Sequence, residues 1–311
     1  MGYASAERRR RRFKKSYEGV LTRSRKSILL RVAFDFKSCQ KQCLSELLGT
    51  YLLVLVGSTS IILVSLIPNF SQLEDLGLVA FAFAGIVGIL VILLGKYSGT
   101  IINPALTFAA AFGKLLKGNF IIPYLFSQII GGLLAGLTLK YLFGHIDASA
   151  SLGSSKLATG VNPITGIIIE VIGTFVLACS LLIASTKIKS ARYQALFVGA
   201  TLFILVLFMG PLTGASFNPA RSLGPALASG YLENLYVYFI GPISGAVLAG
   251  ILFRVIKDED ASQKDIFSSM LRDRRKNLMA RLTFARKKLL GRKLPVLTQF
   301  QSPVNQRATK L

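Results

Sequence analysis

Long apolar stretches alternate with short polar ones through the middle of the chain. A helix that crosses the hydrocarbon core of a membrane needs about 20 mainly apolar residues, because each residue rises about 1.5 Å. Six stretches meet or nearly meet this length: approximately 44–67, 76–95, 120–143, 164–186, 195–211 and 235–256. The pattern therefore predicts an all-α membrane protein with six transmembrane helices.

Glycine is frequent inside these stretches, often at spacings of three to five residues. Small residues at such spacings let helix backbones approach closely in lipid, so we expect tight packing between the spans. The glycines in question are Gly85, Gly88, Gly131, Gly132, Gly136, Gly173, Gly241, Gly245 and Gly250.

Two further apolar segments, 103–113 and 218–228, are too short to cross a membrane, and each begins with Asn-Pro-Ala. Asn is a preferred helix N-cap and Pro is preferred at the first helical position, so a short helix is predicted after Asn103 and after Asn218. The turn is expected to leave the side-chain amide of each Asn free to donate into a pore. Non-helical backbone at membrane depth is tolerated only where protein buries it or where it lines a wet cavity.

The two halves of the apolar region resemble each other. The stretch 45–57 (SELLGTYLLVLVG) matches 169–181 (IEVIGTFVLACSL), and 98–109 (SGTIINPALTFA) matches 213–224 (TGASFNPARSLG). Three spans per half is an odd number, so the second copy must lie inverted in the membrane. Inverted repeats predict two half-helices that enter from opposite sides and meet at the midplane.

Charge is concentrated at the two ends of the chain. The 311 residues carry a net charge of +23 although 52% of them are hydrophobic. We therefore divide the chain into a basic N-terminal tail (1–43), a membrane domain (44–256) and a basic C-terminal tail (257–311). Repeat one covers about 44–143 and repeat two about 164–256.

The distribution of Lys and Arg predicts the orientation in the membrane. If both tails face the cytoplasm, 34 of the 37 Lys and Arg residues lie on that side, the exceptions being Lys140, Lys156 and Arg221. This bias is the one that the positive-inside rule describes. The basic region before the first span is too long for a cleaved signal peptide. We expect an uncleaved multi-pass protein in the plasma membrane, with both termini cytoplasmic.

The C-terminal tail contains a helical pattern of its own. Apolar residues recur at steps of four and seven through 264–293, which predicts an amphipathic helix with a basic face. Such a helix can bind anionic lipid, each basic residue near the surface contributing about 1 kcal/mol. Binding to a partner protein and an unstructured basic tail are the open alternatives, whereas nucleic acid is not an expected partner.

The sequence offers no catalytic machinery. It contains no catalytic triad and no phosphate-binding loop, and its three cysteines and single His145 make neither a disulfide framework nor a credible metal site. We therefore expect no enzyme activity, no cofactor and no metal.

The two Asn-Pro-Ala motifs, the Glu-x-x-Gly-Thr near the start of each half and the string NPARSLGPAL resemble the aquaporin (major intrinsic protein) family over about 42–256. The resemblance implies a homotetramer with one pore per subunit. Two helix N-termini at one point would place two positive dipole ends there, each about half an elementary charge. That field disfavours cations and protons, while a neutral dipolar molecule merely reorients. The implied pore-motif residues are Asn103, Pro104, Ala105, Asn218, Pro219 and Ala220.

Glu46 and Glu170 are the carboxylates that lie well inside the spans. An intramembrane carboxylate is a functional candidate by default, and proton coupling in a carrier is one interpretation. In the other interpretation, each accepts hydrogen bonds from the irregular backbone beside a half-helix, which is the role that the family resemblance implies.

The resemblance also implies four constriction residues, by their spacing from the motif asparagines: Phe83, Val206, Ala215 and Arg221. Arg221 lies one turn into the second half-helix, where its permanent charge would repel cations and its N–H groups would face a solute. Val206 and Ala215 replace the His and the small polar residue or Cys of the strictly water-selective pattern. A wider and less polar opening is expected.

Other positions favour the water-channel group, since the glycerol group usually has Asp after the Arg. These positions are Ser222, Ala226, Tyr238 and Phe239. Ile101 stands where the family usually has His. The indications on solute selectivity are therefore mixed.

The sequence predicts a passive channel for water and small uncharged solutes such as glycerol or urea, which excludes ions and protons. One alternative is an ion- or proton-coupled carrier that uses Glu46 and Glu170, the only residues able to supply a coupling site. The other is a membrane-anchored scaffold that acts through its basic tails, which would not explain Arg221 and the paired motifs.

Overall fold

The computed structural model describes residues 39–66, 72–146, 148–259 and 271–272. The chain divides into two compact units, 1–256 and 257–311, and the fold described below is that of the first unit. The amphipathic helix predicted over 264–293 lies outside the described residues, apart from two of them.

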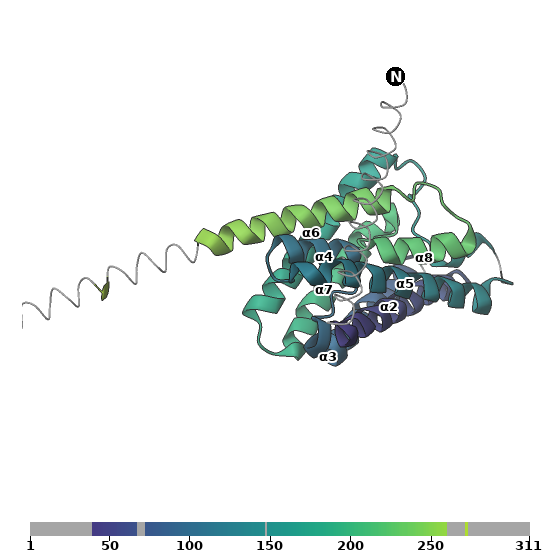
Figure 1. The fold of residues 1–311 in the computed structure, drawn as a ribbon. Coiled ribbons are helices and arrows are strands. Elements are labelled where there is room, and N and C mark those ends of the chain that lie inside the picture. The colour runs from purple at the N-terminus through teal and green to yellow at the C-terminus, as the bar shows by residue number, and fades with distance from the viewer. Residues whose placement is uncertain (1–38, 67–71, 147, 260–270, 273–311) are drawn as a thin grey trace, which may run out of the picture. The chain divides into compact units, whose positions relative to one another are not determined.

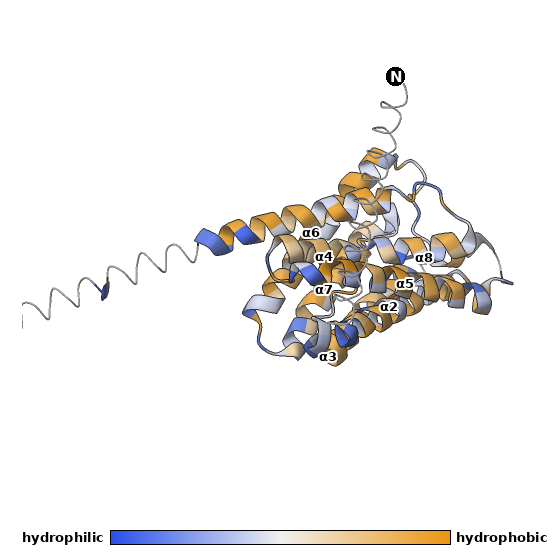
Figure 2. Cartoon of the chain, in the orientation of Figure 1, coloured by the Kyte–Doolittle hydropathy of each residue, from blue (hydrophilic) through white to orange (hydrophobic). Residues whose placement is uncertain are grey.

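Six long helices form the bundle, and each has the length and composition needed to cross a membrane. Figure 2 shows hydrophobic residues along most of their length. The six spans predicted from the sequence are therefore confirmed. The helices are α2 (Gln40–Leu66), α3 (Gln72–Ser98), α5 (Gly118–Phe143), α6 (Pro163–Lys187), α7 (Ala191–Thr213) and a last, unlabelled helix, Val237–Glu259.

The ends of the helices differ by a few residues from the predicted ends, as α7 shows. The apolar stretch begins at 195, but the helix begins at Ala191 and runs to Thr213. Its first turn is polar and still helical, and within it Gln194 donates from Nε2 to Ile188 O, at the end of α6, at 2.7 Å. The helix ends where Gly214 takes a left-handed conformation. Hydropathy marks the membrane-embedded length, whereas backbone chemistry marks the helix ends.

The two short helices are confirmed as well: α4 is Pro104–Phe112 and α8 is Pro219–Ser229 (Figure 1). Asn103 Oδ1 accepts the backbone N–H of Ala105 at 2.8 Å, and Asn218 Oδ1 accepts that of Ala220 at 3.0 Å. Each Asn is therefore the N-cap that the sequence predicts. A short 3₁₀ segment, η1 (Ala148–Gly153), lies between α5 and α6.

Glycines bring α5 and α8 into backbone contact. A Cβ on Gly224 would lie 2.0 Å from Gly132 O, and a Cβ on Gly136 would lie 2.2 Å from Gly224 O. The last helix meets α6 in the same way, since a Cβ on Gly245 would lie 2.2 Å from Val171 O. Gly85, by contrast, has nothing within 4 Å, so the expectation of close packing is wrong at that position.

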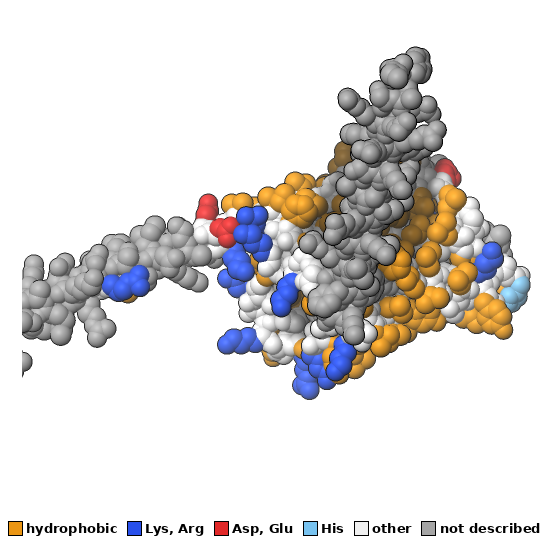
Figure 3. Space-filling model, in the orientation of Figure 1, with side chains coloured by type: hydrophobic (Ala, Val, Ile, Leu, Met, Phe, Trp, Pro, Cys, Tyr) orange, Lys and Arg blue, Asp and Glu red, His pale blue; other side chains and the backbone are white. Residues whose placement is uncertain are grey.

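The outer surface of the bundle is strongly apolar. Large apolar side chains such as Phe81, Tyr141 and Phe208 are at least 70% exposed. Figure 3 shows Lys and Arg side chains of the first unit gathered toward one end, with a broad apolar region beyond them. An apolar surface of this extent is unfavourable in water and suits the hydrocarbon core of a bilayer. The chain is an integral, multi-pass membrane protein.

The contact between α5 and α8 yields a stability prediction. Gly224→Ala should lower the unfolding temperature of the detergent-solubilised protein, because the added methyl must push α8 away from Gly132, a kind of overpacking that costs about 1–3 kcal/mol. Gly85→Ala is the matched control and should not lower it. Equal unfolding temperatures for the two variants would contradict the close approach.

Candidate functional site

A buried carboxylate holds the loop before α4. Glu46 on α2 is fully buried, and its Oε1 accepts the backbone N–H of Ile101 at 3.0 Å. Its Oε2 accepts the N–H of Ile102 and the side-chain amide of Gln128, the latter at 2.7 Å. Both carboxylate oxygens are thus occupied by protein donors.

Glu170 on α6 holds the loop before α8 in the same way. Its Oε1 accepts the N–H of Ser216 at 3.0 Å and the hydroxyl of Thr213 at 2.7 Å. Its Oε2 accepts the N–H of Phe217 at 2.7 Å. The structure therefore places both glutamates where the family resemblance implies, on the backbone beside the half-helices.

Each loop contains two residues other than glycine in the left-handed region of φ. Thr100 and Ile102 have φ of 50° and 43°, and Ala215 and Phe217 have φ of 42° and 52°. They lie three residues and one residue before each motif Asn. This conformation is uncommon for residues with a side chain, and it persists only where the surroundings impose it. The carboxylate hydrogen bonds supply that constraint in both loops.

The repeated Glu-x-x-Gly pattern has a steric basis here. Gly49 lies one turn after Glu46, and a Cβ on it would lie 2.5 Å from Ile102 Cγ2. Gly173 lies one turn after Glu170, and a Cβ on it would lie 2.1 Å from the Phe217 ring. The Glu binds the loop backbone, and the Gly leaves room for the side chain before the motif Asn.

The planar trans peptide fixes where the carbonyl groups of the first loop point. The N–H groups of Ile101 and Ile102 both face Glu46, and the chain has no cis peptide among the described residues. The carbonyl oxygens of Thr100 and Ile101, which share those peptide planes, therefore point away from Glu46. Thr100, Ile101 and Ile102 all line the cavity described below.

The two half-helices meet through their asparagines. Asn103 donates from Nδ2 to Phe217 O at 2.8 Å, and Asn218 donates from Nδ2 to Ile102 O at 3.1 Å. The expectation that the whole amide is free is corrected here, because one of its two hydrogens ties the opposite loop in place. The second hydrogen of each Nδ2 remains for the cavity.

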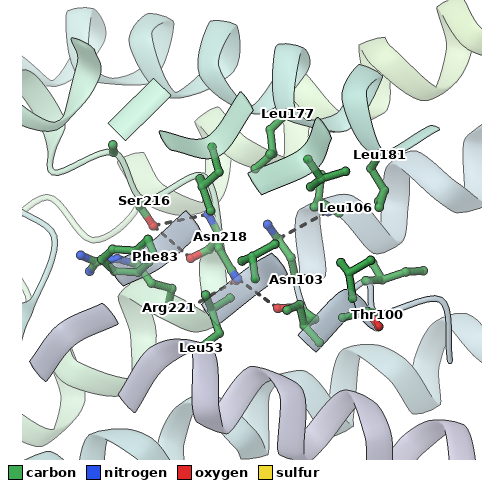
Figure 4. A pocket seen from close by; sticks show the side chains of 17 residues that line it. Leu53, Phe83, Thr100, Asn103, Leu106, Leu177, Leu181, Ser216, Asn218 and Arg221 are labelled. Carbon is green, nitrogen blue, oxygen red and sulfur yellow. Dashed lines mark hydrogen bonds between the residues drawn. The ribbon is translucent and has the colours of Figure 1, made fainter. Parts of the chain in front are cut away.

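A narrow cavity runs past this junction. In Figure 4, Phe83 and Arg221 lie at one end of it, Thr100 and Leu181 at the other, and the two asparagines between them. Its polar lining comes from the loops and the half-helices: Thr100, Asn103, Ser216, Asn218 and Arg221. The facing wall is apolar, with side chains from α2, α3, α6 and α7: Leu53, Val87, Val91, Leu177, Val198 and Leu202.

The other pore-motif residues lie behind this surface. Pro104 and Pro219 occupy the first position of each half-helix, where a missing N–H costs nothing. Ala105 and Ala220 are fully buried against neighbouring helices, and neither lines the cavity.

Arg221 is 1% exposed and is fixed through one nitrogen. Its Nη1 donates to Gly153 O at 3.0 Å and to Ser155 Oγ at 2.7 Å. Its Nε and Nη2 have no hydrogen-bond partner among the described residues. The guanidinium carbon lies 5.3 Å from the centroid of the Phe83 ring, within cation–π range. Two donor atoms of a buried cation are therefore without a hydrogen-bond partner among the described residues.

The four predicted constriction residues are only partly brought together. Phe83, Ala215 and Arg221 line the narrow cavity. Val206 lines a second, more open cavity, which includes Arg221 as well and is bordered by Asp75. Arg221 therefore stands at the boundary of the two cavities, with Val206 on one side of it.

Sequence reasoning missed several polar residues of the site, Gln128 among them. Gln128 is fully buried; besides Glu46 it contacts Thr107 of α4, whose hydroxyl lies 3.0 Å from Oε1. The signal was available, because an uncharged polar residue in an otherwise apolar span needs a partner inside the protein. Among the described residues, no group of His, Cys, Asp and Glu can hold a metal ion.

A membrane-spanning bundle with a lined passage between two half-helices defines the chain as a channel. The chain belongs to the major intrinsic protein family, whose model matches residues 34–253. It is 32% identical over 234 residues to aquaporin NIP1-2 of Arabidopsis thaliana, covering 74% of this chain and 78% of that one. Nodulin-26 of Glycine max is 29% identical over 238 residues, covering 75% and 85%.

A solved structure supports the fold. The aquaglyceroporin from Plasmodium falciparum superposes with a TM-score of 0.57 at 18% identity, over 70% of this chain and 95% of that one. Membership of this family makes the chain a passive channel for water and small neutral solutes rather than an enzyme.

The geometry of Glu170 yields a second prediction. Glu170→Gln replaces one acceptor oxygen with an NH₂ group, so a buried donor in the loop loses its partner, at about 1–3 kcal/mol. We expect a lower unfolding temperature and a lower water permeability per folded channel. Glu233→Gln, at an exposed carboxylate that accepts from the Tyr231 hydroxyl, is the control and should change neither. A Glu170→Gln protein with wild-type values for both would show that the carboxylate does not hold the loop.

Proposed function

We propose that this channel conducts water together with small uncharged solutes such as glycerol or urea. The observation that carries the proposal is the two-sided lining of the narrow cavity, polar along the loops and apolar along the facing helices. A solute with hydroxyl groups on one edge and carbon on the other matches both walls at once. Water needs only the polar side.

The residues around Arg221 support this solute class. Val206 and Ala215 carry no polar side-chain atoms, and both are buried, at 3% and 5% exposure. Phe83 supplies an apolar face, and Arg221 supplies the two unpartnered donors. We assign these four residues as the selectivity constriction, with its steric cutoff set where the passage is narrowest.

Exclusion of ions is assigned to two positive features. The N-termini of α4 and α8 meet at Asn103 and Asn218, so their dipoles point at one place in the passage. Arg221 adds a full charge close to it. A permeating cation loses hydration in a narrow passage and gains repulsion, whereas a neutral solute gains hydrogen bonds.

Glu46 and Glu170 act as structural supports in this proposal. Both are fully buried, and all four of their carboxylate oxygens accept hydrogen bonds from protein donors. A coupling site would need a carboxylate that a permeant ion can reach, so the carrier alternative is not favoured. A membrane-anchored scaffold that acts through its tails would not explain the paired half-helices, so this alternative is not favoured either.

The setting of the channel is proposed from charge and family. Residues 44–256 form the channel domain, flanked by basic tails at 1–43 and 257–311 that contact anionic lipid. We place the protein in the plasma membrane as a homotetramer, with both termini in the cytoplasm. The residues that support this orientation lie at helix ends and in the loops between helices: Lys96, Lys114, Lys117, Lys187, Lys189 and Arg192.

Stopped-flow light scattering of proteoliposomes tests the proposed solute class. Vesicles that contain the full chain should change volume faster than empty vesicles after an osmotic shock, which reports water flux. They should also change volume faster in gradients of glycerol or of urea, which report solute flux. A protein that conducts water but excludes both glycerol and urea would overturn the proposal on solutes and leave a water-selective channel.

The constriction yields a third prediction. Val206→His adds a bulky polar ring beside Arg221 and should lower the glycerol-to-water permeability ratio about tenfold, which corresponds to a barrier difference of about 1.4 kcal/mol. Val206→Leu is the control for bulk without polarity and should lower the ratio less. A Val206→His variant whose ratio equals that of the wild type would remove Val206 from the constriction.

Arg221 yields a fourth prediction. Arg221→Val removes one fixed positive charge and should raise proton or cation leak in proteoliposomes, but only partly, because the paired helix dipoles remain. Arg192→Val removes a charge from an exposed position in the first turn of α7 and serves as the control. An unchanged leak in well-folded Arg221→Val protein would mean that Arg221 is not part of the ion barrier.

A further inference from the structure

Three buried serines form a continuous chain behind Arg221. Ser155 Oγ accepts from Arg221 Nη1 at 2.7 Å and lies 2.8 Å from Ser222 Oγ. Ser222 Oγ is hydrogen bonded in turn to Ser216 Oγ, and Ser216 Oγ donates to Asn218 O at 3.0 Å. The chain starts at the guanidinium and ends at the N-cap of the same half-helix.

The two ends of the chain fix its direction. Arg221 has only donors, so Ser155 must accept at one end. The carbonyl of Asn218 has only acceptor capacity, so Ser216 must donate at the other. Each hydroxyl has a single hydrogen, and therefore Ser155 donates to Ser222 and Ser222 donates to Ser216. Every member is thus both donor and acceptor, and such chains strengthen cooperatively.

We propose that Ser155 is a positioning residue for selectivity, and that Ser222 and Ser216 act through it to hold the guanidinium of Arg221 against the wall of the passage. The inference deepens the proposed function, because it assigns how the constriction keeps its shape. Nη1 is held by Ser155 and Gly153, which leaves Nε and Nη2 for the solute.

This chain gives Ser222 a role at the constriction. Ser222 is 1% exposed and does not line either cavity. It nevertheless lies two hydrogen bonds from the Arg221 guanidinium, by way of Ser155. A residue behind the wall can therefore set the position of a donor on the wall, without any contact with the solute.

Ser155→Ala removes one of the two acceptors of Nη1 and leaves only Gly153 O, so the guanidinium is held less tightly and can lean into the passage. We expect the glycerol-to-water permeability ratio to fall roughly three- to tenfold, while water permeability stays within about twofold, since one hydrogen bond to a charged group is lost. Ser155→Thr keeps the hydroxyl and should restore most of the ratio.

Substitutions at Ser222 test the direction of the chain. Ser222→Ala leaves the hydroxyl hydrogen of Ser155 without an acceptor and should also lower the ratio. Ser222→Asp keeps an acceptor for the hydroxyl hydrogen of Ser155, so its ratio should lie closer to that of the wild type. If Ser222→Ala and Ser222→Asp lower the permeability ratio equally, packing alone explains the effect, and the proposed role of the serine hydrogen-bond chain is wrong.

Ser229→Ala is the matched control. Ser229 links the same loop to α8, because its hydroxyl lies 3.3 Å from Ser154 Oγ, but it has no contact with Arg221 or the serine chain. Its ratio should equal that of the wild type. If Ser229→Ala and Ser155→Ala lower the ratio alike, the loop contact in general matters and Ser155 has no positioning role.

A structure of the Ser155→Ala channel in lipid nanodiscs separates this inference from the proposed function. The guanidinium of Arg221 should leave its position beside Gly153, whether or not the wild type conducts glycerol. If it keeps that position, the inference fails. If the wild type excludes glycerol and urea, the proposed solute class fails, and the guanidinium position still decides the role of Ser155.

Discussion

The structure depends on two buried carboxylates that accept hydrogen bonds from backbone N–H groups, as water does at an exposed loop. Glu46 and Glu170 accept the backbone N–H groups of the two non-helical loops that precede the half-helices. Without these acceptors, the left-handed residues of both loops would be strained and their donors would be unpaired. The half-helices then start at fixed points, and their asparagines meet.

The meeting of the half-helices determines the chemistry of the passage. Asn103 and Asn218 each use one amide hydrogen on the opposite loop, so neither half-helix can shift alone. Arg221 lies on the half-helix that Asn218 caps, and its guanidinium is fixed by Ser155 and Gly153 in the segment between α5 and α6. We therefore propose that selectivity follows from backbone placement first and from the size of individual side chains second.

Much of this fold could be predicted from the sequence. The six spans follow from apolar length, and the half-helix starts follow from Asn-Pro. The repeat placed Glu46 and Glu170 in corresponding positions. These features are local or repeated, so one sequence carries enough information about them.

The rest depends on contacts between distant segments. The cross-ties from Asn103 and Asn218 join the two repeats, and the partner of Arg221 is Ser155, 66 positions away in a connecting segment without apolar periodicity. Val206 borders the second cavity rather than the narrow one, because the tilt and rotation of α7 are set by packing. The predicted helix over 264–293 lies outside the described residues.

The positive potential from Arg221 and from the N-termini of α4 and α8 should let water pass and exclude cations and protons. The most direct test of this claim is to record osmotic water flux and internal pH in the same proteoliposomes while a proton gradient is imposed. The account predicts fast water flux, no change of internal pH beyond that of empty vesicles, and no uphill accumulation of glycerol. Proton entry that rises with the amount of channel, or accumulation of solute driven by the gradient, would contradict it.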